Sequence, residues 1–220
     1  MNIEQLISPV VPVLSLEDTG TKALQLMEET GLAHLPLVAD EQYLALVAES
    51  SLLDWETPDL PLKDAGFLNY KPVVMAVAHP YDALRTTHQH NLTVLPVVDN
   101  GNHYLGSITR DDLLKYIAEN SSLDTPGAIV VLEMDPRNYT LYEIARVFEN
   151  EDVVVLGTQL YTNPVNGNLE VTIKTNRTDL QAVISSLERH EYRVKQVYGE
   201  VAHEEDVQSR YNLLMNYINM

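Results

Sequence analysis

The sequence predicts an α+β protein that consists of two tandem β-α-β-β-α repeats, a β-α-β-β-α-β unit and a terminal helix. Two observations lead to this prediction. The first half of the chain repeats itself at an offset of 60 to 61 residues, and the pattern of apolar residues changes after a polar segment at residues 121–127. Because 45% of the residues are hydrophobic and 21% are charged, the chain can bury ordinary cores.

The internal repeat gives the first two predicted units, residues 1–65 and 66–121. The copies match at an offset of 60 residues and, after one inserted residue, at an offset of 61. The matching segments are 19–24 with 79–84, 31–38 with 91–98, and 43–55 with 104–116. A repeat of about 60 residues buries little apolar surface alone, so we expect the two copies to pack against each other.

Each copy is expected to form a short strand, a helix, a strand centred on Leu-Pro, a turn, another strand and a closing helix. The residues Asp99 to Asn102 predict the turn of the second copy, because Asn and Gly tolerate positive φ. Apolar residues at the spacing of one helix face are Ala23, Leu24 and Met27 in the first helix and Leu113, Leu114 and Ile117 in the last.

The third unit is predicted at residues 127–200. Residues 129–134 form a buried strand, and two more strands at 153–161 and 169–175 flank an Asn-rich turn. Residues 140–143 and 178–181 are capping boxes that open two helices, followed by a closing strand at 193–198. The expected core-facing helix residues are Leu141, Ile144, Ala145, Phe148, Leu180, Val183, Ile184 and Leu187. This order is the ferredoxin-like split motif, which hosts many functions.

Residues 203–220 are predicted to form a C-terminal helix. Val207, Tyr211, Leu214 and Ile218 recur at four-three-four spacing and form a one-sided apolar stripe. Two alternatives remain for this stripe: it covers the sheet of its own chain, or it packs across a dimer interface.

Charge and composition exclude several classes of protein. The formal net charge of −18 repels nucleic-acid backbones, so nucleic-acid binding is not expected. No apolar stretch approaches the roughly 20 residues of a membrane span, and the N-terminus lacks the features of a secretory signal. Cysteine is absent, which removes disulfides, thiolate metal sites and a cysteine nucleophile. We therefore expect a cytoplasmic protein that makes no membrane contact.

The second copy, with Ala83-Leu84, the strand 94–98 ending in Asp99, and the segment 105–114, resembles a CBS domain. The pair of copies resembles a Bateman module. This resemblance covers residues 1 to about 121 and implies clefts between the repeats that hold an adenosyl ligand such as AMP, ADP, ATP or S-adenosylmethionine. It also implies a sensor rather than a catalyst.

The third unit resembles an ACT domain, and the whole order resembles the CBS-CBS-ACT arrangement of acetoin-utilisation accessory proteins. Amino-acid-sensing ACT domains usually carry a glycine where the first strand meets the first helix, and residues 135–139 contain none. The resemblance therefore favours a dimer-building role for this unit over amino-acid binding. A homodimer is also expected because flat helical faces and open sheet edges tend to be covered.

The candidate ligand site lies at the boundary between a strand and a helix in the second copy. Thr109 offers a hydroxyl, the helix start offers free amides for a phosphate, and the Asp112 carboxylate can accept two ribose hydroxyls. The alternative for this pair is simple N-capping. Arg110 is a candidate phosphate partner or an exposed arginine. The resemblance adds Leu95, Pro96 and Val73 as walls for the base.

The first copy has Ala48 and Ser51 where the second has Thr109 and Asp112, so at most one ordinary adenosine site is expected. His88 and His90 point in different directions on a helix and are not expected to chelate a metal, and the acidic run 203–206 is expected to be a solvated helix start. The usual catalytic motifs are absent. The sequence therefore predicts a non-catalytic regulatory protein, and the alternative is a scaffold whose clefts are empty.

Overall fold

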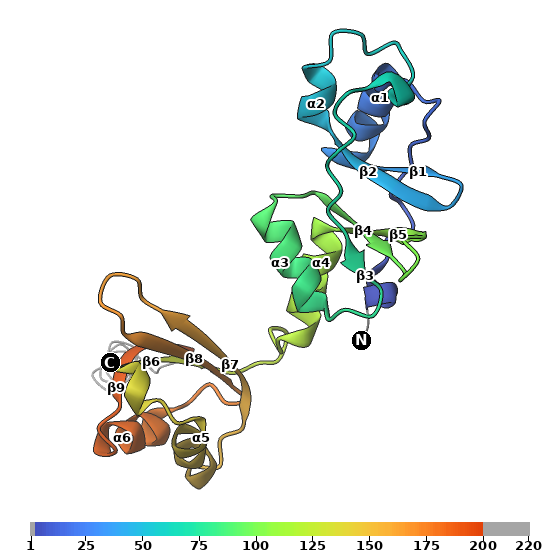
Figure 1. Cartoon of the computed structure of the whole chain (residues 1–220). Helices are drawn as coiled ribbons and strands as arrows, with labels where there is room; N and C mark the ends of the chain where they lie inside the picture. Colours follow the sequence, from blue (N-terminus) through green and yellow to red (C-terminus); the bar gives the residue numbers. More distant parts are fainter. Residues whose placement is uncertain (1–2, 200–220) are drawn as a thin grey trace, which may run out of the picture. The chain divides into compact units, whose positions relative to one another are not determined.

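The computed structural model describes residues 3–199, and the chain divides into two compact units, Met1–Ile117 and Ala118–Met220 (Figure 1). The predicted C-terminal helix at residues 203–220 lies outside the described residues. The N-terminal unit contains two buried clusters, one centred on each repeat, and the C-terminal unit contains a third.

The first repeat is built on a two-stranded antiparallel sheet, β1–β2. The strand predicted at its start is reduced to a single parallel bridge between Leu14 and Leu37. Thr19 caps the start of helix α1, because its side chain accepts a hydrogen bond from the amide of Lys22. Gly31, in the left-handed conformation, caps the end of this helix. The elements are η1 (Ile3–Leu6), α1 (Gly20–Thr30), β1 (His34–Ala39), β2 (Gln42–Ala48), α2 (Glu49–Leu53) and η2 (Leu62–Asp64).

The second repeat has the complete predicted order β-α-β-β-α. Strand β3 runs parallel to β4, and β4 pairs antiparallel with β5. The predicted turn at Asp99 to Asn102 is present: an oxygen of the Asp99 carboxylate accepts the amides of Gly101 and His103, and Asn102 has a φ of 63°. The elements are β3 (Val74–Met75), α3 (Pro80–Gln89), β4 (Val94–Val98), β5 (Tyr104–Thr109) and α4 (Arg110–Asn120).

Hydrogen bonds join the hairpins of the two repeats, and we call this contact the hairpin seam. The amide of Tyr43 donates to the carbonyl of Asn102 (3.2 Å), and the Asn102 side-chain amide donates to the carbonyl of Tyr43 (2.9 Å). The amide of Tyr104 donates to the carbonyl of Glu41 (2.8 Å). Tyr43 and Leu46 of β2 are buried in the same cluster as the core of the second repeat. The predicted packing of one copy against the other is therefore confirmed.

The N-terminal segment of the first repeat is also part of the second repeat's core. Ile3 and Leu6 are buried there, and the amide of Ser8 donates to the carbonyl of Ser107 in β5 (2.8 Å). This close approach requires a glycine at Gly106, because a Cβ there would lie 2.3 Å from Cγ2 of Ile7 and the backbone φ is +148°.

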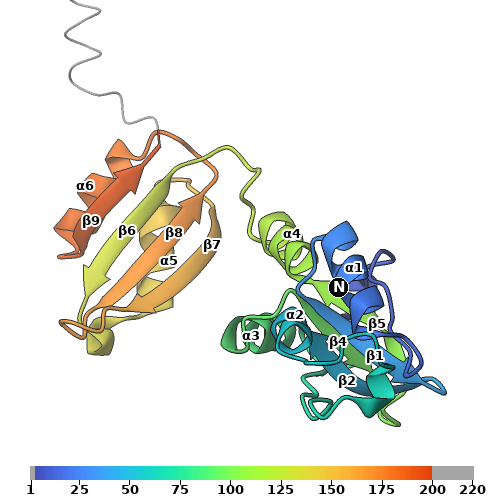
Figure 2. The ribbon, with the colours of Figure 1, turned by 90° about the horizontal axis from the view of Figure 1, so that it is seen from above.

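The C-terminal unit is a four-stranded sheet of order β7-β8-β6-β9, and α5 and α6 pack on one of its faces (Figure 2). Alternate residues of β8, from Leu169 to Thr175, are buried beneath the helices. The elements are β6 (Ile129–Met134), η3 (Pro136–Asn138), α5 (Leu141–Asn150), β7 (Val155–Thr162), β8 (Leu169–Thr175), α6 (Gln181–Arg189) and β9 (Arg193–Tyr198).

Several local expectations are wrong. Thr140 makes no side-chain cap to α5, and Glu143 instead pairs with Arg146 at 2.8 Å. Helix α6 begins at Gln181 rather than at the predicted box, with Asp179 accepting the Gln181 amide.

Two helix positions expected to face a core are exposed. Leu114 is 65% exposed and Leu141 is 46% exposed. In α5 the buried face is formed by Ile144, Val147 and Phe148, and Leu141, the first residue of the helix, lies outside it.

His34 links the repeats through a contact that depends on its protonation state. Its Nδ1 accepts the backbone amide of Thr93 (3.3 Å) and lies 3.0 Å from the Thr93 hydroxyl, so this nitrogen carries no proton. Burial lowers the pKa of His34, the positive charge of Arg110 lowers it further, and the charge of Glu49 opposes both.

We expect the N-terminal unit to lose stability as the pH falls below about 6.5, because unfolding restores the ordinary pKa of His34 and the unfolded state then binds more protons. Urea unfolding followed by the fluorescence of Trp55, the only tryptophan, measures this at about pH 7.5 and about pH 5.5. In His34→Asn the difference between the two conditions should shrink, whereas His88→Asn, an exposed control, should keep it. An equal difference in all three proteins would contradict the assignment.

Candidate ligand site at the start of helix α4

The side chains of Thr109 and Asp112 form a reciprocal cap where β5 passes into α4. The amide of Asp112 donates to Oγ1 of Thr109 (3.1 Å), and the amide of Thr109 donates to Oδ2 of Asp112 (2.9 Å). The Thr109 hydroxyl donates to the same Oδ2. This is a capping box with aspartate in the place of glutamate, so the capping alternative for these two residues is realised in the structure.

The cap also places a carboxylate in a fixed position. Both residues are half-buried, and within residues 3–199 the hydrogen bonds described for Asp112 side-chain atoms end on Oδ2. The remaining oxygen, Oδ1, is therefore held in position at the helix start without serving the cap. A carboxylate oxygen in this state is suited to accept a hydroxyl of a ligand.

Arg110 is exposed, as one of the two alternatives expected, but its guanidinium is hydrogen-bonded to the protein. Its Nε and Nη2 donate to the carbonyl of Leu92 (3.0 and 2.8 Å), and Nη2 also contacts the side-chain oxygen of Asn91 (3.2 Å). Asn91 follows α3 and has a φ of 50°. Arg110 thus ties the end of α3 to the start of α4, and most of its donors are not available to a phosphate.

Of the three predicted wall residues, Leu95 and Pro96 lie on β4 and Val73 lies just before β3. Leu95 is fully buried in the core, so its side chain belongs to the interior rather than to a cleft wall. Pro96 pairs with Ser107 and is also buried, whereas Val73 is half-buried and directly precedes β3. The structure therefore brings Thr109, Asp112 and Arg110 together and leaves Val73 as the most accessible of the proposed walls.

The corresponding helix start of the first repeat lacks the cap. Ala48 is the N-cap residue of α2 and makes no side-chain hydrogen bond there. Helix α2 has five residues, compared with eleven in α4. The replacement of Thr109 and Asp112 by Ala48 and Ser51 in this copy thus coincides with a shorter helix that has no fixed carboxylate.

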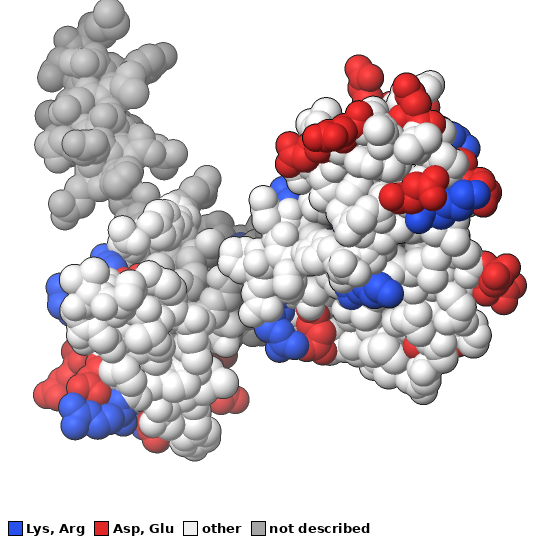
Figure 3. Space-filling view, turned by 45° about the horizontal axis from the view of Figure 1, so that its top comes forward, with Lys and Arg blue, Asp and Glu red and all other residues white. Residues whose placement is uncertain are grey.

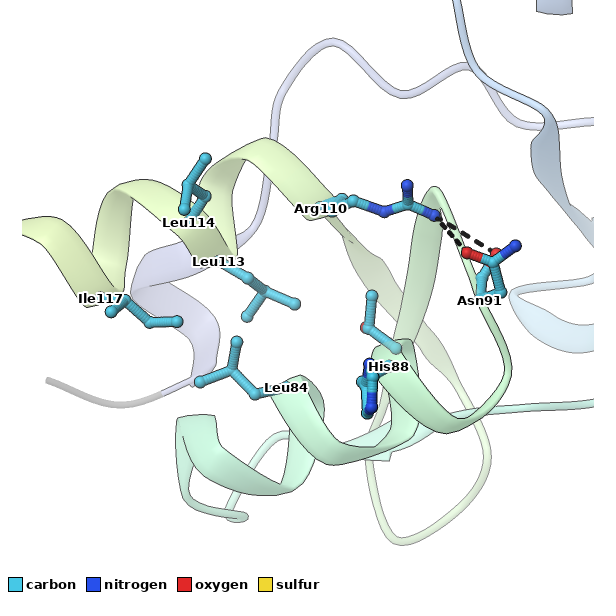
Figure 4. Close-up of a pocket in the computed structure, with 8 residues that line it drawn as sticks. Leu84, His88, Asn91, Arg110, Leu113, Leu114 and Ile117 are labelled. Carbon is cyan, nitrogen blue, oxygen red and sulfur yellow. Dashed lines mark hydrogen bonds between the residues drawn. The ribbon is translucent and has the colours of Figure 1, made fainter. Parts of the chain in front are cut away.

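A cavity of about 310 Å³ that sequence reasoning missed lies between α3 and α4 (Figure 4). Leu84 approaches from α3, while Leu113 and Ile117 approach from α4, and the Arg110–Asn91 contact lies at one end. Leu114 of α4 also lines the cavity, but its side chain points away from α3 in Figure 4. The cavity is further lined by His88 and by Thr87, whose buried hydroxyl has no hydrogen-bond partner among the described residues. The sequence pattern assigned Leu114 to the core, whereas the structure exposes this apolar residue at the groove.

Charge around the site is unfavourable to highly charged anions. Asp111 and Asp112 both lie in the first turn of α4. In Figure 3, red carboxylate side chains lie at several separate places on the N-terminal unit, with white surface between them. Across residues 3–199, no three His, Asp or Glu side chains cluster in a way that could hold a metal ion, and no helix there is long and apolar enough to cross a bilayer.

Comparison with known proteins places the two repeats. Residues 3–56 and 71–119 match the family model of the CBS domain. A homoserine O-acetyltransferase from Methanosphaerula palustris is 27% identical over 120 residues, which cover 52% of this chain and 24% of that protein. The chain therefore spans about a quarter of the length of this curated relative.

Three solved structures illustrate the similarity to known folds. A Vibrio cholerae protein assigned to acetoin utilization is 22% identical, with 56% of this chain and 95% of that chain covered and a TM-score of 0.49. A CBS domain pair/ACT domain protein from Thermotoga maritima is 18% identical, with coverages of 54% and 98% and a TM-score of 0.47. CBSX2 in complex with AMP is 20% identical, with coverages of 54% and 96% and a TM-score of 0.47.

We expect Thr109→Ala to lower the free energy of unfolding of the N-terminal unit by about 1 kcal/mol, because it removes the hydroxyl that accepts the Asp112 amide. Thr109→Ser keeps a hydroxyl and should recover most of this loss. Urea unfolding followed by Trp55 fluorescence measures both variants. If the serine and alanine variants are equally destabilised, the lost methyl packing rather than the cap accounts for the change.

Proposed function

We propose that the chain is a regulatory protein that binds an adenosyl ligand at the second repeat, from the premise that residues 3–56 and 71–119 match the family model of the CBS domain. The observation that carries the proposal is the capped pair Thr109 and Asp112 at the start of α4. It supplies a fixed carboxylate oxygen that can accept ribose hydroxyls, at a helix start where Thr109 and Asp112 bind each other's amides. The matching position in the first repeat has neither Thr109 nor Asp112, so we propose one site in each chain.

Electrostatics favour a ligand of low negative charge. A triphosphate at the start of α4 meets Asp111 and Asp112, while most donors of Arg110 are already bound to Leu92 and Asn91. The chain as a whole also carries a formal net charge of −18. We therefore place AMP and the sulfonium cation S-adenosylmethionine ahead of ADP and ATP as ligands.

The role we propose is sensing rather than catalysis. The similarity to the acetyltransferase covers 24% of that protein, and this chain has no cysteine and no Gly-x-Ser-x-Gly segment. A cytoplasmic location stays a prediction from the sequence, and the assignment of the C-terminal unit as an ACT-like, dimer-building domain remains part of the same proposal.

The competing function is a scaffold whose clefts hold no ligand. Titration calorimetry of the full chain with AMP, ADP, ATP and S-adenosylmethionine separates the two functions. Binding of AMP or S-adenosylmethionine supports the sensor. The absence of heat with all four ligands, at concentrations that detect a Kd of about 0.1 mM, would count against the sensor and favour the scaffold.

We expect Asp112→Ala to lower the affinity for the nucleotide at least about tenfold, because it removes charge-assisted hydrogen bonds to ribose. Asp112→Asn keeps an acceptor for the Thr109 amide and should therefore be more stable than the alanine variant. It should still lower the affinity for the ligand. Ser51→Ala, the matched change in the first repeat, should leave affinity unchanged. Should both Asp112 variants lose stability but keep wild-type affinity, Asp112 is a cap alone.

We also propose that two copies associate through the groove between α3 and α4. The groove is apolar along Leu84, Leu113 and Ile117, and Leu114 at its border is 65% exposed. In the first repeat, Trp55 and Phe67 of the loop after α2 pack against the core. We therefore place the homodimer contact at the groove of the second repeat rather than at the first repeat.

Light scattering of the full chain should give a mass of about twice 24.8 kDa. Leu114→Lys places a charge in the groove and should raise the dimer dissociation constant at least about tenfold. Leu53→Lys is the matched control, since Leu53 occupies the equivalent position of α2 and is 68% exposed. A monomeric wild-type chain, or equal weakening by both variants, would count against this groove.

A further inference from the structure

The segment that precedes β4 is held from two sides. The amide of Thr93 donates to Nδ1 of His34 (3.3 Å), and the Thr93 hydroxyl lies 3.0 Å from the same nitrogen. On the other side, the carbonyl of Thr93 accepts the amide of Arg110 (3.0 Å), and the Arg110 guanidinium binds the carbonyl of Leu92. His34, which begins β1 of the first repeat, is therefore connected to the start of α4 through one residue, Thr93.

This connection ends at the candidate ligand site. Arg110 directly follows Thr109, and Val94, the neighbour of Thr93, is paired with Thr109 between β4 and β5. The amide and the hydroxyl of Thr109 in turn hold one carboxylate oxygen of Asp112. A displacement of Thr93 is therefore passed through backbone hydrogen bonds to the residues that hold the Asp112 carboxylate.

The contact runs in one direction between the repeats. At the offset of 60 residues, Val94 stands where the first repeat has His34, and Ala33 stands where the second repeat has Thr93. The backbone part is kept, because the carbonyl of Ala33 accepts the amide of Glu49 at the start of α2 (2.9 Å). Valine and alanine side chains carry no hydrogen-bonding group, so the side-chain part has no counterpart there. The histidine acts on the start of α4, where the candidate ligand site lies.

We propose that His34 is a positioning residue for the ligand site of the second repeat and makes the affinity of this site depend on pH. The inference rests on the proposed function, because it assigns a control to the same site. In the neutral ring, Nδ1 of His34 accepts the donors of Thr93. Protonation turns Nδ1 into a donor, so the Thr93 amide loses its acceptor and the contact opens. The site therefore binds its ligand with lower affinity when His34 is protonated.

The surroundings of His34 set the pH at which this change occurs. Burial has the largest effect and lowers the pKa of His34 from its ordinary value of 6.5. The positive charge of Arg110 lowers this pKa further, and the negative charge of Glu49 opposes both. The other neighbours, Thr93 and the strand partner Ala48, carry no charge. Affinity is therefore complete near neutral pH and is lost as the pH falls through the lowered pKa of His34.

Titration calorimetry of the full chain with AMP at about pH 7.5 and about pH 5.5 tests this dependence. His34→Asn keeps a side-chain oxygen as an acceptor but does not titrate, so at the higher pH it should bind AMP within about twofold of the wild type. At the lower pH the wild type should lose at least about threefold more affinity than His34→Asn. The AMP phosphate has a pKa of about 6, but its effect cancels in this comparison.

His34→Val places the matched side chain of the second repeat at this position and removes the acceptor. At the higher pH its affinity for AMP should be at least about threefold below that of the wild type, whereas His34→Asn restores binding. Fluorescence of Trp55 checks that each protein is folded under both conditions. The inference is overturned if His34→Val binds AMP as the wild type does, or if the wild type loses no more affinity than His34→Asn.

Hydrogen exchange without ligand separates this inference from the proposed function. The amide of Arg110 is bonded to the carbonyl of Thr93, and the amide of Ala76, bonded to the carbonyl of Val98, reports the general stability of the unit. From about pH 7.5 to about pH 5.5, the protection factor of the Arg110 amide should fall at least about threefold more than that of Ala76 in the wild type, but not in His34→Asn. Equal losses at both amides would overturn the coupling even if AMP binds. The absence of AMP binding in every protein would instead overturn the ligand site, and the exchange of Arg110 still decides whether His34 acts on the start of α4.

Discussion

The N-terminal unit depends on a core that neither repeat can complete alone. Tyr43 and Leu46 of β2, together with Ile3 and Leu6 of the N-terminal segment, are buried in the same cluster as Ile108 of β5. Burial of apolar side chains is the dominant favourable contribution to folding, and a repeat of about 60 residues has little of it. The hairpin seam and the contact at Gly106 follow from this shared burial, and they hold the first half of β5, the strand that leads into α4.

The same two residues can serve structure and ligand binding without conflict. Thr109 and Asp112 satisfy each other's backbone amides through one hydroxyl and one carboxylate oxygen, and the second oxygen is held in place at no further conformational cost. Preorganisation of this kind reduces the entropy lost on binding. Arg110 contributes by position rather than by charge, since its guanidinium joins the end of α3 to the start of α4. The first repeat, with Ala48 and Ser51, keeps the fold but not this arrangement.

The distribution of charged residues determines which surfaces of the molecule can bind anions and which can contact a second copy. An acidic chain disfavours polyanions at the start of α4, and it also disfavours self-association wherever carboxylates face one another. The α3–α4 groove and the β7 edge are apolar or uncharged. On β9, the other edge strand, Arg193 and Lys195 form ion pairs with Glu133 of β6 and Glu170 of β8.

The sequence by itself determined the features that depend on neighbouring residues. Three local patterns are present in the structure: the turn at Asp99, the alternation of β8 and the Thr109–Asp112 pair. The repeat was also readable from the sequence, because its two copies can be aligned directly. Tertiary structure decided which faces are covered and which donors are used. Leu114 and Leu141 fit an apolar stripe but remain exposed, and Arg110 binds carbonyls 18 and 19 positions earlier in the chain. A periodic pattern defines a face but not what packs on it, because burial and hydrogen bonding depend on residues that only the folded chain brings together.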